Sequence, residues 1–224
     1  FMTILVTGGC GFIGSNFINN WLSTTNEKII NIDNLSYASN SKTAKIIDKN
    51  YHFHKLNINE SKKITKILNL YKPRAIINFA AETHVDNSIK NPKIFFDNNL
   101  NCLIIFIQTL ISYYKNKKYK FIQISTDEVF GSLSKNELSF QENSQYKPNN
   151  PYSASKASGD HLVRSFYKTF KFPGIVTNCS NNFGPYQNNE KFIPTIISNL
   201  INKKKIPVYG KGKNIRNWIY VEDN

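Results

Sequence analysis

A glycine-rich turn directly after the first apolar segment restricts the possible folds more than any other feature of the sequence. The run Gly8–Gly14 lies between a strand-like Ile4–Thr7 and a helical pattern over Ile13–Ser23. Two overlapping sets fit the spacing of a dinucleotide-binding turn: Gly9, Gly11 and Gly14, or Gly8, Gly11 and Gly14. Glycines let such a turn close tightly and let its backbone approach a pyrophosphate, whose charge a helix N-terminus favours. The sequence therefore predicts a strand–turn–helix unit that binds a dinucleotide.

Apolar, β-rich runs alternate with helical patterns along the chain. The expected strands are Ile4–Thr7, Ile29–Asp33, Tyr51–Leu56, Ala75–Phe79, Lys120–Ser125 and Ile175–Cys179. The expected helices are Ile13–Ser23, Ser61–Tyr71, Pro92–Tyr114, Ser153–Phe170 and Ile193–Asn202. Near-continuous apolar strands separated by helices favour a doubly wound parallel α/β sheet of the Rossmann type. We expect a nucleotide-binding domain over residues 1–180, then the incomplete start of a substrate-binding lobe with a returning strand over 181–224.

The balance of charge raises the question of nucleic acid, because the 224-residue chain carries a formal net charge of +14. The densest lysine clusters, Lys115–Lys118 and Lys203–Lys205, lie where helices are expected to end, and cations there complement the helix dipole. No recognition motif accompanies the charge. We therefore expect no nucleic-acid partner.

Neither a secretion signal nor a membrane span is expected. Phe1 leads straight into a strand-like segment, and the apolar run Leu103–Ile111 is interrupted by Gln108 and Thr109 and is too short to cross a bilayer. The cysteines, Cys10, Cys102 and Cys179, are odd in number and lack metal-type spacing. We expect free thiols, no metal and a cytoplasmic location.

An acidic residue ends the second expected strand. Asp33 lies 19 positions beyond Gly14, where a carboxylate can bond the ribose hydroxyls of an adenosine. A carboxylate repels a 2′-phosphate, and Asn34 and Ser36 supply no positive charge, so NAD is favoured over NADP. The alternative is that Asp33 only caps a turn.

Candidate catalytic residues follow the fifth expected strand and open the next helix. Thr126-Asp127-Glu128 comes at a strand's carboxyl end, where this fold places its chemistry. Tyr152 and Lys156 are four residues apart and share one helix face. A cation beside a phenol stabilises the phenolate, so we expect a lowered pKa that makes Tyr152 a base towards a sugar hydroxyl.

With these motifs in place, the chain resembles the dTDP-glucose 4,6-dehydratases, a family of extended short-chain dehydrogenases/reductases. The segments that carry the resemblance are Thr7–Gly14, Asp33–Asn40, Ala80–Ser88, Ser125–Gly131, Pro151–Arg164, Thr177–Pro185, Glu190–Pro194 and Val208–Asp223. Related 4-epimerases and decarboxylases share the glycine turn and the Tyr/Lys pair but lack the adjacent Asp127-Glu128. The resemblance implies an NAD-dependent lyase that converts NDP-glucose to the 4-keto-6-deoxy sugar, as in rhamnose synthesis.

The resemblance also implies a role for each catalytic residue. Tyr152 takes the proton of the sugar 4-OH while the C4 hydride passes to NAD. Glu128 then removes the C5 proton, Asp127 protonates the departing C6 hydroxyl, and the hydride returns to C6. Thr126 bonds the sugar near O4, and Lys156 bonds the nicotinamide ribose. One carboxyl must be protonated and the other ionised, and neighbouring carboxyls in a closed site tend to be pushed apart in this way.

Binding residues are implied in the same way. Those for NAD are Gly8, Gly11, Phe12, Ile13, Gly14, Asp33, Asn34, Ser36, Asn57, Ile58, Ala80, Ala81, Tyr152, Lys156 and Asn182. Those for the nucleotide sugar are His84, Thr126, Asn181, Lys191, Phe192, Val208, Tyr209 and Arg216, with Arg216 on the diphosphate. His84 could equally be a loop histidine satisfied by its neighbours. The family further implies a homodimer whose interface uses Pro92–Tyr114, with Ile104–Ile107 on that face, and Tyr152–Phe170.

Several positions depart from the family pattern. Asn57 replaces an aspartate near the adenine, Cys102 a glycine and Asn217 an aspartate. Asn87 replaces an arginine, and Thr83–Ser88 looks closer to the UDP-glucose 4,6-dehydratases. The nucleotide, thymidine or uridine, therefore stays open.

The length of the chain adds a further expectation. Family members continue well beyond Glu222-Asp223, so we expect a C-terminally truncated member that binds NAD but dehydrates NDP-glucose poorly. Two other functions stay open. One is a nucleotide-sugar 4-epimerase, which Asp127-Glu128 disfavours, and the other is a catalytically inactive NAD-binding module.

Overall fold

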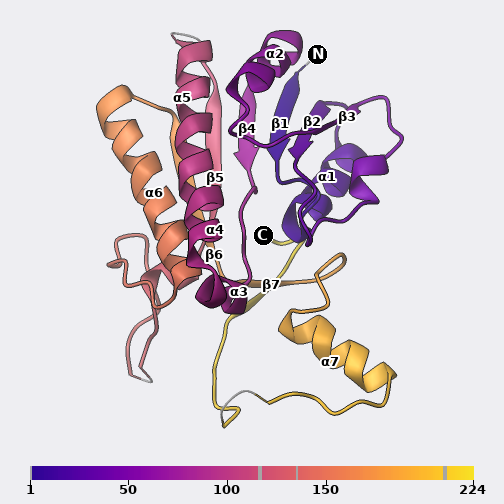
Figure 1. The fold of residues 1–224 in the computed structure, drawn as a ribbon, viewed down its shortest axis with the longest axis vertical. Helices are drawn as coiled ribbons and strands as arrows, with labels where there is room; N and C mark the ends of the chain where they lie inside the picture. The colour runs from indigo at the N-terminus through magenta and orange to yellow at the C-terminus, as the bar shows by residue number, and fades with distance from the viewer. Residues whose placement is uncertain (1, 116–117, 135, 209–210) are drawn as a thin grey trace.

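The computed structural model describes residues 2–115, 118–134, 136–208 and 211–224. A six-stranded parallel sheet organises the fold, in the order β3-β2-β1-β4-β5-β6 (Figure 1). Its strands are β1 (Thr3–Thr7), β2 (Lys28–Asp33), β3 (Tyr51–Lys55), β4 (Ala75–Asn78), β5 (Lys120–Thr126) and β6 (Gly174–Cys179). The order reverses between β1 and β4, which is the switch point of a doubly wound sheet. The predicted fold class is confirmed.

Helices cover both faces of the sheet. The main ones are α1 (Phe12–Thr24), α2 (Ser61–Tyr71), α5 (Cys102–Tyr114) and α6 (Pro151–Phe170). On one face Leu5 packs with Ile64 of α2, Phe106 of α5 and Val163 of α6. On the other face Ile4 packs with Ile18 of α1. Because successive residues of β1 enter opposite clusters, both faces of the strand are buried, which explains its unbroken apolar run.

The long helical pattern over Pro92–Tyr114 forms in three parts. A short α4 (Pro92–Phe96) passes through one π-helical segment, η2 (Asp97–Asn101), into α5. By length and composition alone this helix could cross a membrane, with a mean hydropathy of 1.5, although 44% of it is buried inside the molecule. The apolar run Leu103–Ile111, which we judged too short to cross a bilayer, is therefore only part of a longer apolar helix. Its apolar residues pack on the sheet through Leu103 and Leu110.

The expectation that Ile104–Ile107 belongs to a dimer face is wrong in part. Phe106 and Ile107 are completely buried in the core against the sheet. The helix turns only Ile104 and Ile105 outward, and Ile105 is 37% exposed. The reason is the helical repeat, because residues two apart lie on opposite sides of a helix.

Smaller elements were missed or shifted at their ends. Unexpected are α3 (Val85–Lys90) and the 3-10 turns η1 (Thr43–Lys45) and η3 (Asp127–Phe130). The helix expected from Ser153 begins at Pro151, because Asn150 and Ser153 form a reciprocal capping box. The lysine clusters follow α5 and the C-terminal helix as expected, although Asn116 and Lys117 lie outside the described residues.

The C-terminal part stands apart from the large sheet. It consists of β7 (Asn181–Phe183), α7 (Phe192–Ile201) and β8 (Trp218–Tyr220), and β7 pairs with β8 in parallel. Figure 1 shows α7 projecting away from the strands. No residue of α7 is buried, and its exposed apolar side chains include Phe192, Ile197, Leu200 and Ile201.

Candidate functional site

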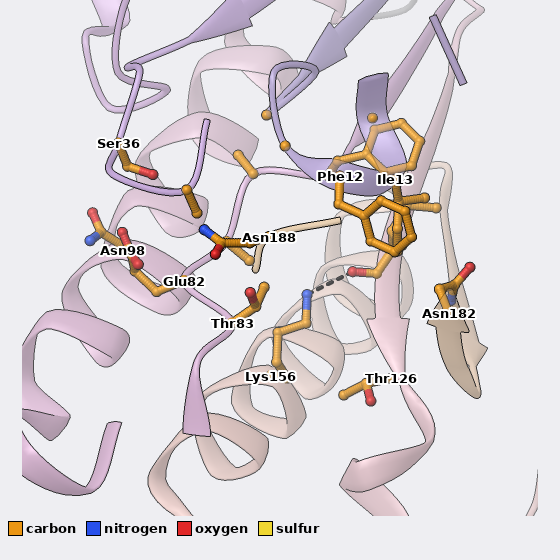
Figure 2. Close-up of a pocket in the computed structure, with 18 of the residues that line it drawn as sticks. Phe12, Ile13, Ser36, Glu82, Thr83, Asn98, Thr126, Lys156, Asn182 and Asn188 are labelled. Carbon is orange, nitrogen blue, oxygen red and sulfur yellow. Dashed lines mark hydrogen bonds between the residues drawn. The ribbon is translucent and has the colours of Figure 1, made fainter. Parts of the chain in front are cut away.

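A cavity of about 380 Å³ opens along the carboxyl ends of the strands (Figure 2). Every residue expected to contact NAD lines it: Gly8, Gly11, Phe12, Ile13, Gly14, Asp33, Asn34, Ser36, Asn57, Ile58, Ala80, Ala81, Tyr152, Lys156 and Asn182. Four further expected residues also line it, namely Thr126, Asn181, Lys191 and Phe192, as does Glu128. The sheet thus brings together segments from Gly8 to Phe192, which are 184 positions apart in the chain.

The turn between β1 and α1 has the geometry of a phosphate cradle. Gly8 has φ +68°, and a Cβ there would lie 2.4 Å from the Ala80 nitrogen. A Cβ on Gly14 would lie 2.7 Å from the Gly8 carbonyl oxygen. Gly11 is the residue directly before α1, and neither a side-chain cap nor an acidic residue occupies this helix N-terminus. Open N–H groups at a helix start suit an anion.

The structure decides between the two glycine sets. Gly8, Gly11 and Gly14 line the cavity, whereas Gly9 points the other way. A Cβ on Gly9 would lie 2.3 Å from the Asn31 side-chain oxygen, which accepts a hydrogen bond from the Gly9 N–H at 3.1 Å. Gly9 is therefore required for packing against β2.

The Asp33 carboxylate accepts hydrogen bonds within the turn and also lines the cavity. One carboxylate oxygen accepts from the Cys10 N–H at 2.9 Å, and the other from the Leu35 N–H at 2.7 Å and the Ser39 hydroxyl at 3.2 Å. It therefore caps the turn. It also lines the cavity, and a carboxylate accepts about four hydrogen bonds, so it retains capacity for a ligand.

Tyr152 and Lys156 are buried side by side on α6, but their electrostatics differ from expectation. Burial raises the pKa of Tyr152, and Glu128 and Cys179 raise it further, while a hydrogen bond with Thr126 lowers it. The Lys156 ammonium donates to the Ile124 carbonyl oxygen at 2.6 Å (Figure 2). The predicted lowering of the phenol pKa by the cation is wrong for this arrangement.

The acidic pair begins η3 at the end of β5. The Thr126 hydroxyl accepts from the Glu128 N–H at 3.2 Å and lies 3.3 Å from an Asp127 carboxylate oxygen. Burial raises the pKa of Asp127, while a hydrogen bond from the Thr126 hydroxyl and the positive charge of Arg216 lower it. Glu128 lines the cavity and accepts from the Asn150 amide at 3.3 Å. Asp127 lies just outside the lining residues.

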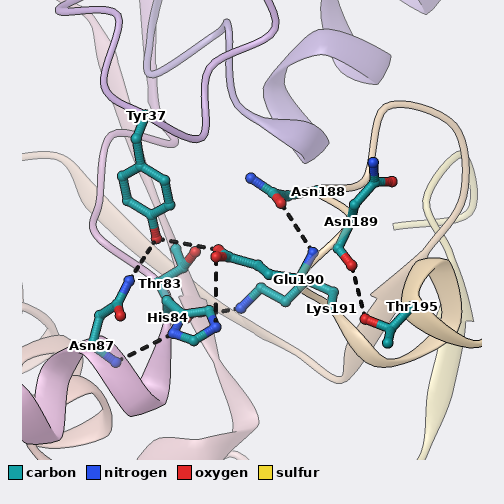
Figure 3. Close-up of polar contacts among 9 residues, drawn as sticks. All are labelled: Tyr37, Thr83, His84, Asn87, Asn188, Asn189, Glu190, Lys191 and Thr195. Atoms are coloured by element: carbon teal, nitrogen blue, oxygen red, sulfur yellow. Dashed lines mark hydrogen bonds and ion pairs between the residues drawn. The ribbon is translucent and has the colours of Figure 1, made fainter. Parts of the chain in front are cut away.

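A polar cluster joins the loop before α7 to the N-terminal half of the chain (Figure 3). Glu190 accepts from the Tyr37 hydroxyl at 3.2 Å and lies 3.7 Å from His84. Lys191 donates to the Thr83 carbonyl oxygen at 3.0 Å. His84 itself caps α3, because its Nδ1 accepts from the Asn87 N–H at 3.2 Å. In this structure His84 therefore has the contacts of a loop histidine satisfied by its neighbours, which was the alternative to a substrate ligand.

Other expected ligand residues do not line the cavity. His84, Val208 and Arg216 lie outside it, and the Arg216 side chain is exposed with one bond to the Ile215 carbonyl oxygen. Tyr209 lies outside the described residues. The strand pairing of β7 with β8 nevertheless returns Trp218 to the cavity wall, two residues from Arg216.

Sequence reasoning missed several lining residues, among them Glu82, Thr83, Asn98, Cys179, Ser180, Gln187, Asn188, Glu190 and Trp218. Glu82 and Thr83 follow β4, and Cys179 ends β6, so the rule that strand ends line the site could have found them. Burial raises the pKa of Glu82, and the nearby Glu190 adds to the shift. No sequence signal points to Asn98, which lies in the π-helical segment.

Comparisons with known proteins agree on one family. A family model described as GDP-mannose 4,6 dehydratase matches residues 5–224. The chain is 43% identical to a dTDP-glucose 4,6-dehydratase of Salmonella typhimurium, over 100% of this chain and 66% of the relative. A dTDP-glucose 4,6-dehydratase of Bacillus anthracis, solved in complex with NAD, is 43% identical with a TM-score of 0.89, over 100% of this chain and 69% of that one.

Epimerases share the fold at lower identity. A UDP-glucose 4-epimerase of Thermotoga maritima, solved with UDP-glucose, is 25% identical with a TM-score of 0.88, over 99% of this chain and 70% of that one. The TM-scores of 0.89 and 0.88 show that the backbone resembles both enzyme types almost equally. The sequence identities of 43% and 25% separate the two types. The chain spans about two thirds of the length of the curated relatives it matches.

Proposed function

Because the chain belongs to the family of the dTDP-glucose 4,6-dehydratases, we propose that it binds NAD and acts in the conversion of an NDP-glucose to its 4-keto-6-deoxy sugar. The observation that carries the proposal is one shared cavity. Its wall joins the glycine cradle after β1 to Thr126 and Glu128 after β5 and to Tyr152 and Lys156 on α6. Deoxysugar synthesis, such as that of rhamnose, is the setting in which such a product is used.

The residues of the cavity fit NAD. Gly8, Gly11 and Gly14 leave room for a pyrophosphate where any Cβ would collide or crowd, and the start of α1 offers open N–H groups. Asp33 would hold the adenosine ribose and exclude a 2′-phosphate. NAD, when bound, accepts and returns the hydride that the reaction moves between C4 and C6 of the sugar.

Tyr152 would take the proton of the sugar 4-OH. Burial opposes this step by raising the pKa of Tyr152, so a nearby cation is needed to stabilise the phenolate. Lys156 is that cation. Its ammonium has three N–H donors, and one of them bonds Ile124 in the described structure. The others would serve the phenolate and the nicotinamide ribose.

The acidic pair would perform the elimination of water. Burial raises the pKa of Asp127, which favours the protonated form that can protonate the departing C6 hydroxyl. Glu128, which reaches the cavity, would remove the C5 proton. Thr126 would hydrogen-bond the sugar near O4.

The sugar nucleotide would lie towards the C-terminal part. Asn181, Lys191 and Phe192 line the cavity there, and we assign His84, Val208, Tyr209 and Arg216 to the same ligand as outer contacts. We assign residues 1–180 to the NAD-binding domain and 181–224 to the start of the substrate lobe, from which Asn182 would reach back to NAD. The outward faces of α4, α5 and α6 would form a homodimer contact, and the setting would be the cytoplasm.

One experiment separates the candidate functions. The purified chain is incubated with NAD and with dTDP-glucose or UDP-glucose, and the products are analysed by NMR. A 4-keto-6-deoxy sugar supports a dehydratase and reveals the nucleotide. A galactose epimer would instead indicate a 4-epimerase, and NAD binding without any sugar product from either nucleotide would indicate an inactive binding module.

A further inference from the structure

The helix that carries Tyr152 and Lys156 places a third buried polar residue one turn further along. Tyr152, Lys156 and Asp160 are spaced by four residues on α6, so they share one helix face. Their exposed fractions are 8%, 5% and 3%, and this face contacts β5 and β6. A carboxyl group buried this deeply has to be accounted for, because an ionised carboxylate is costly away from water unless it is paired.

One oxygen of the Asp160 carboxylate accepts three hydrogen bonds. Its Oδ2 accepts from the Ser125 hydroxyl at 2.6 Å, the Tyr146 hydroxyl at 3.2 Å and the Asn178 amide at 3.4 Å. Asn178 also donates to the Thr126 carbonyl oxygen at 3.1 Å. Asp160 therefore ties α6 to the end of β5, directly before the Thr126-Asp127-Glu128 run.

The other carboxylate oxygen is without a partner. Asp160 Oδ1 is buried and makes no hydrogen bond within the described residues. One turn away, the Lys156 ammonium makes one described bond, to Ile124. The two groups act on each other electrostatically, because Asp160 raises the pKa of Lys156 and Lys156 lowers that of Asp160, in each case against burial. The unpartnered Asp160 Oδ1 and the Lys156 ammonium, which makes one described bond, therefore both belong to the buried face of α6.

We propose that Asp160 is a positioning residue, which holds the Lys156 ammonium and the Ser125–Thr126 strand end in the places that the cavity requires. This role of Asp160 rests on the proposed function, in which Lys156 bonds the nicotinamide ribose and stabilises the Tyr152 phenolate. Asp160 does not line that cavity and acts through Lys156 and Ser125. Its negative charge keeps a lysine charged where burial alone would favour the neutral amine.

The surroundings contain few competing charges. Lys156 is faced by Asp160 on α6 and by the Cys179 thiol at the end of β6, and burial raises the pKa of that thiol. Tyr152, on the same helix, is faced by Glu128, Asp127 and Cys179. Asp160 is faced by Lys156 and by the Tyr146 phenol, whose pKa burial raises to about 12. Within these surroundings Asp160 is the carboxylate that acts most on Lys156.

The test is a direct titration of Lys156. In the chain labelled with ¹³C at lysine Cε, the Lys156 signal is assigned by its loss in Lys156→Arg and followed by NMR against pH. Asp160→Asn keeps the shape and removes the charge. It should move the Lys156 midpoint to lower pH by about one to three units. Tyr146→Phe removes a bond to the same carboxylate but keeps its charge, and Asp160→Glu keeps the charge, so both should leave the midpoint near that of the unchanged chain.

An unchanged midpoint in folded Asp160→Asn would overturn the proposal. A second measurement needs no variant, because the Asp160 carboxyl ¹³C signal of the unchanged chain must report an ionised group at neutral pH. A neutral Asp160 there would overturn the proposal as well. The NAD affinity, measured by calorimetry, should fall as the pH rises through the Lys156 midpoint of each variant. Failure to bind NAD at all would contradict the proposed function, while the lysine titration would still decide the role of Asp160.

Discussion

The Asp33 carboxylate accepts a hydrogen bond from the Cys10 N–H at 2.9 Å, so the acid that ends β2 fastens the glycine turn that follows β1. The same carboxylate accepts from the Leu35 N–H at 2.7 Å. Cofactor choice and the shape of the phosphate cradle are therefore linked through one side chain. Any change at Asp33 must be measured for both.

Replacing Asp33 by Ala together with Asn34→Arg should move the binding preference from NAD towards NADP. The change removes the carboxylate that repels a 2′-phosphate and adds a guanidinium that can bind it. It should also destabilise the fold by roughly 1–3 kcal/mol, because the buried Cys10 N–H and the partly buried Leu35 N–H lose their acceptor. Calorimetric titration with both dinucleotides and thermal unfolding measure the two effects. Asn34→Arg alone is the matched control, and equal NAD/NADP ratios in all forms would mean that Asp33 does not contact the ribose.

Gly8→Ala should abolish cofactor binding and destabilise the chain. The residue has φ +68°, and its Cβ would lie 2.4 Å from the backbone nitrogen of Ala80, which cannot move without displacing the end of β4. The backbone conformation alone costs about 1–2 kcal/mol. Gly212→Ala is a matched control, since Gly212 has φ +64° but, among the described residues, its Cβ would meet only a Val208 side-chain atom at 3.2 Å. If both variants lost the same stability and kept NAD affinity, no cradle would exist at Gly8.

Glu128→Gln should leave oxidation at sugar C4 possible but suppress exchange of the C5 proton with solvent. The expected loss is about 10²–10⁴-fold, the range typical of general base catalysis. Incorporation of solvent deuterium at C5 is measured by NMR. Asn150→Asp provides a control, because it removes the amide that bonds Glu128 but keeps a side-chain oxygen to cap α6, and it should retain part of the exchange. Undiminished C5 exchange in Glu128→Gln would assign the base elsewhere.

Asp127 should give the chain a pH-dependent stability of predictable sign. Burial raises its pKa in the folded state, so its contribution is fully present below the unfolded pKa and is lost as pH rises through the folded pKa. Asp127→Asn should remove this loss, so its stability relative to the unchanged chain should improve from acidic to neutral pH. Urea unfolding at a series of pH values measures the difference. A relative stability that falls with pH would mean that the carboxyl is better stabilised when ionised.

Much of the fold could be predicted from sequence because its strands are buried on both faces. Apolar runs such as Ile29–Asp33 differ from the β2 of the structure by one residue. The helix Ser61–Tyr71 forms at its predicted bounds, because its amphipathic pattern buries one face in the core beside α5. The family resemblance read from the sequence is confirmed at 43% identity.

Other features depended on contacts between distant segments. β7 and β8 are three residues each and exist only because Asn181–Phe183 meets Trp218–Tyr220. The upward shift in the pKa of Tyr152 depends mainly on burial and then on the nearby Glu128, which residue spacing does not specify. Asp160 carries no motif of its own, and only the packing of α6 on β5 and β6 reveals its partners.

The most direct test of the proposed function is the reaction itself, run in deuterated water with NAD and dTDP-glucose or UDP-glucose and followed by NMR. Since the chain spans about two thirds of its relatives, a version extended at its C-terminus by the corresponding segment of a relative is run beside it. We predict that NAD binds and that a 4-keto-6-deoxy product with solvent deuterium at C5 forms with the chain or with the extended version. Product without deuterium at C5, a galactose epimer, or no product from either version despite bound NAD would contradict the proposed function.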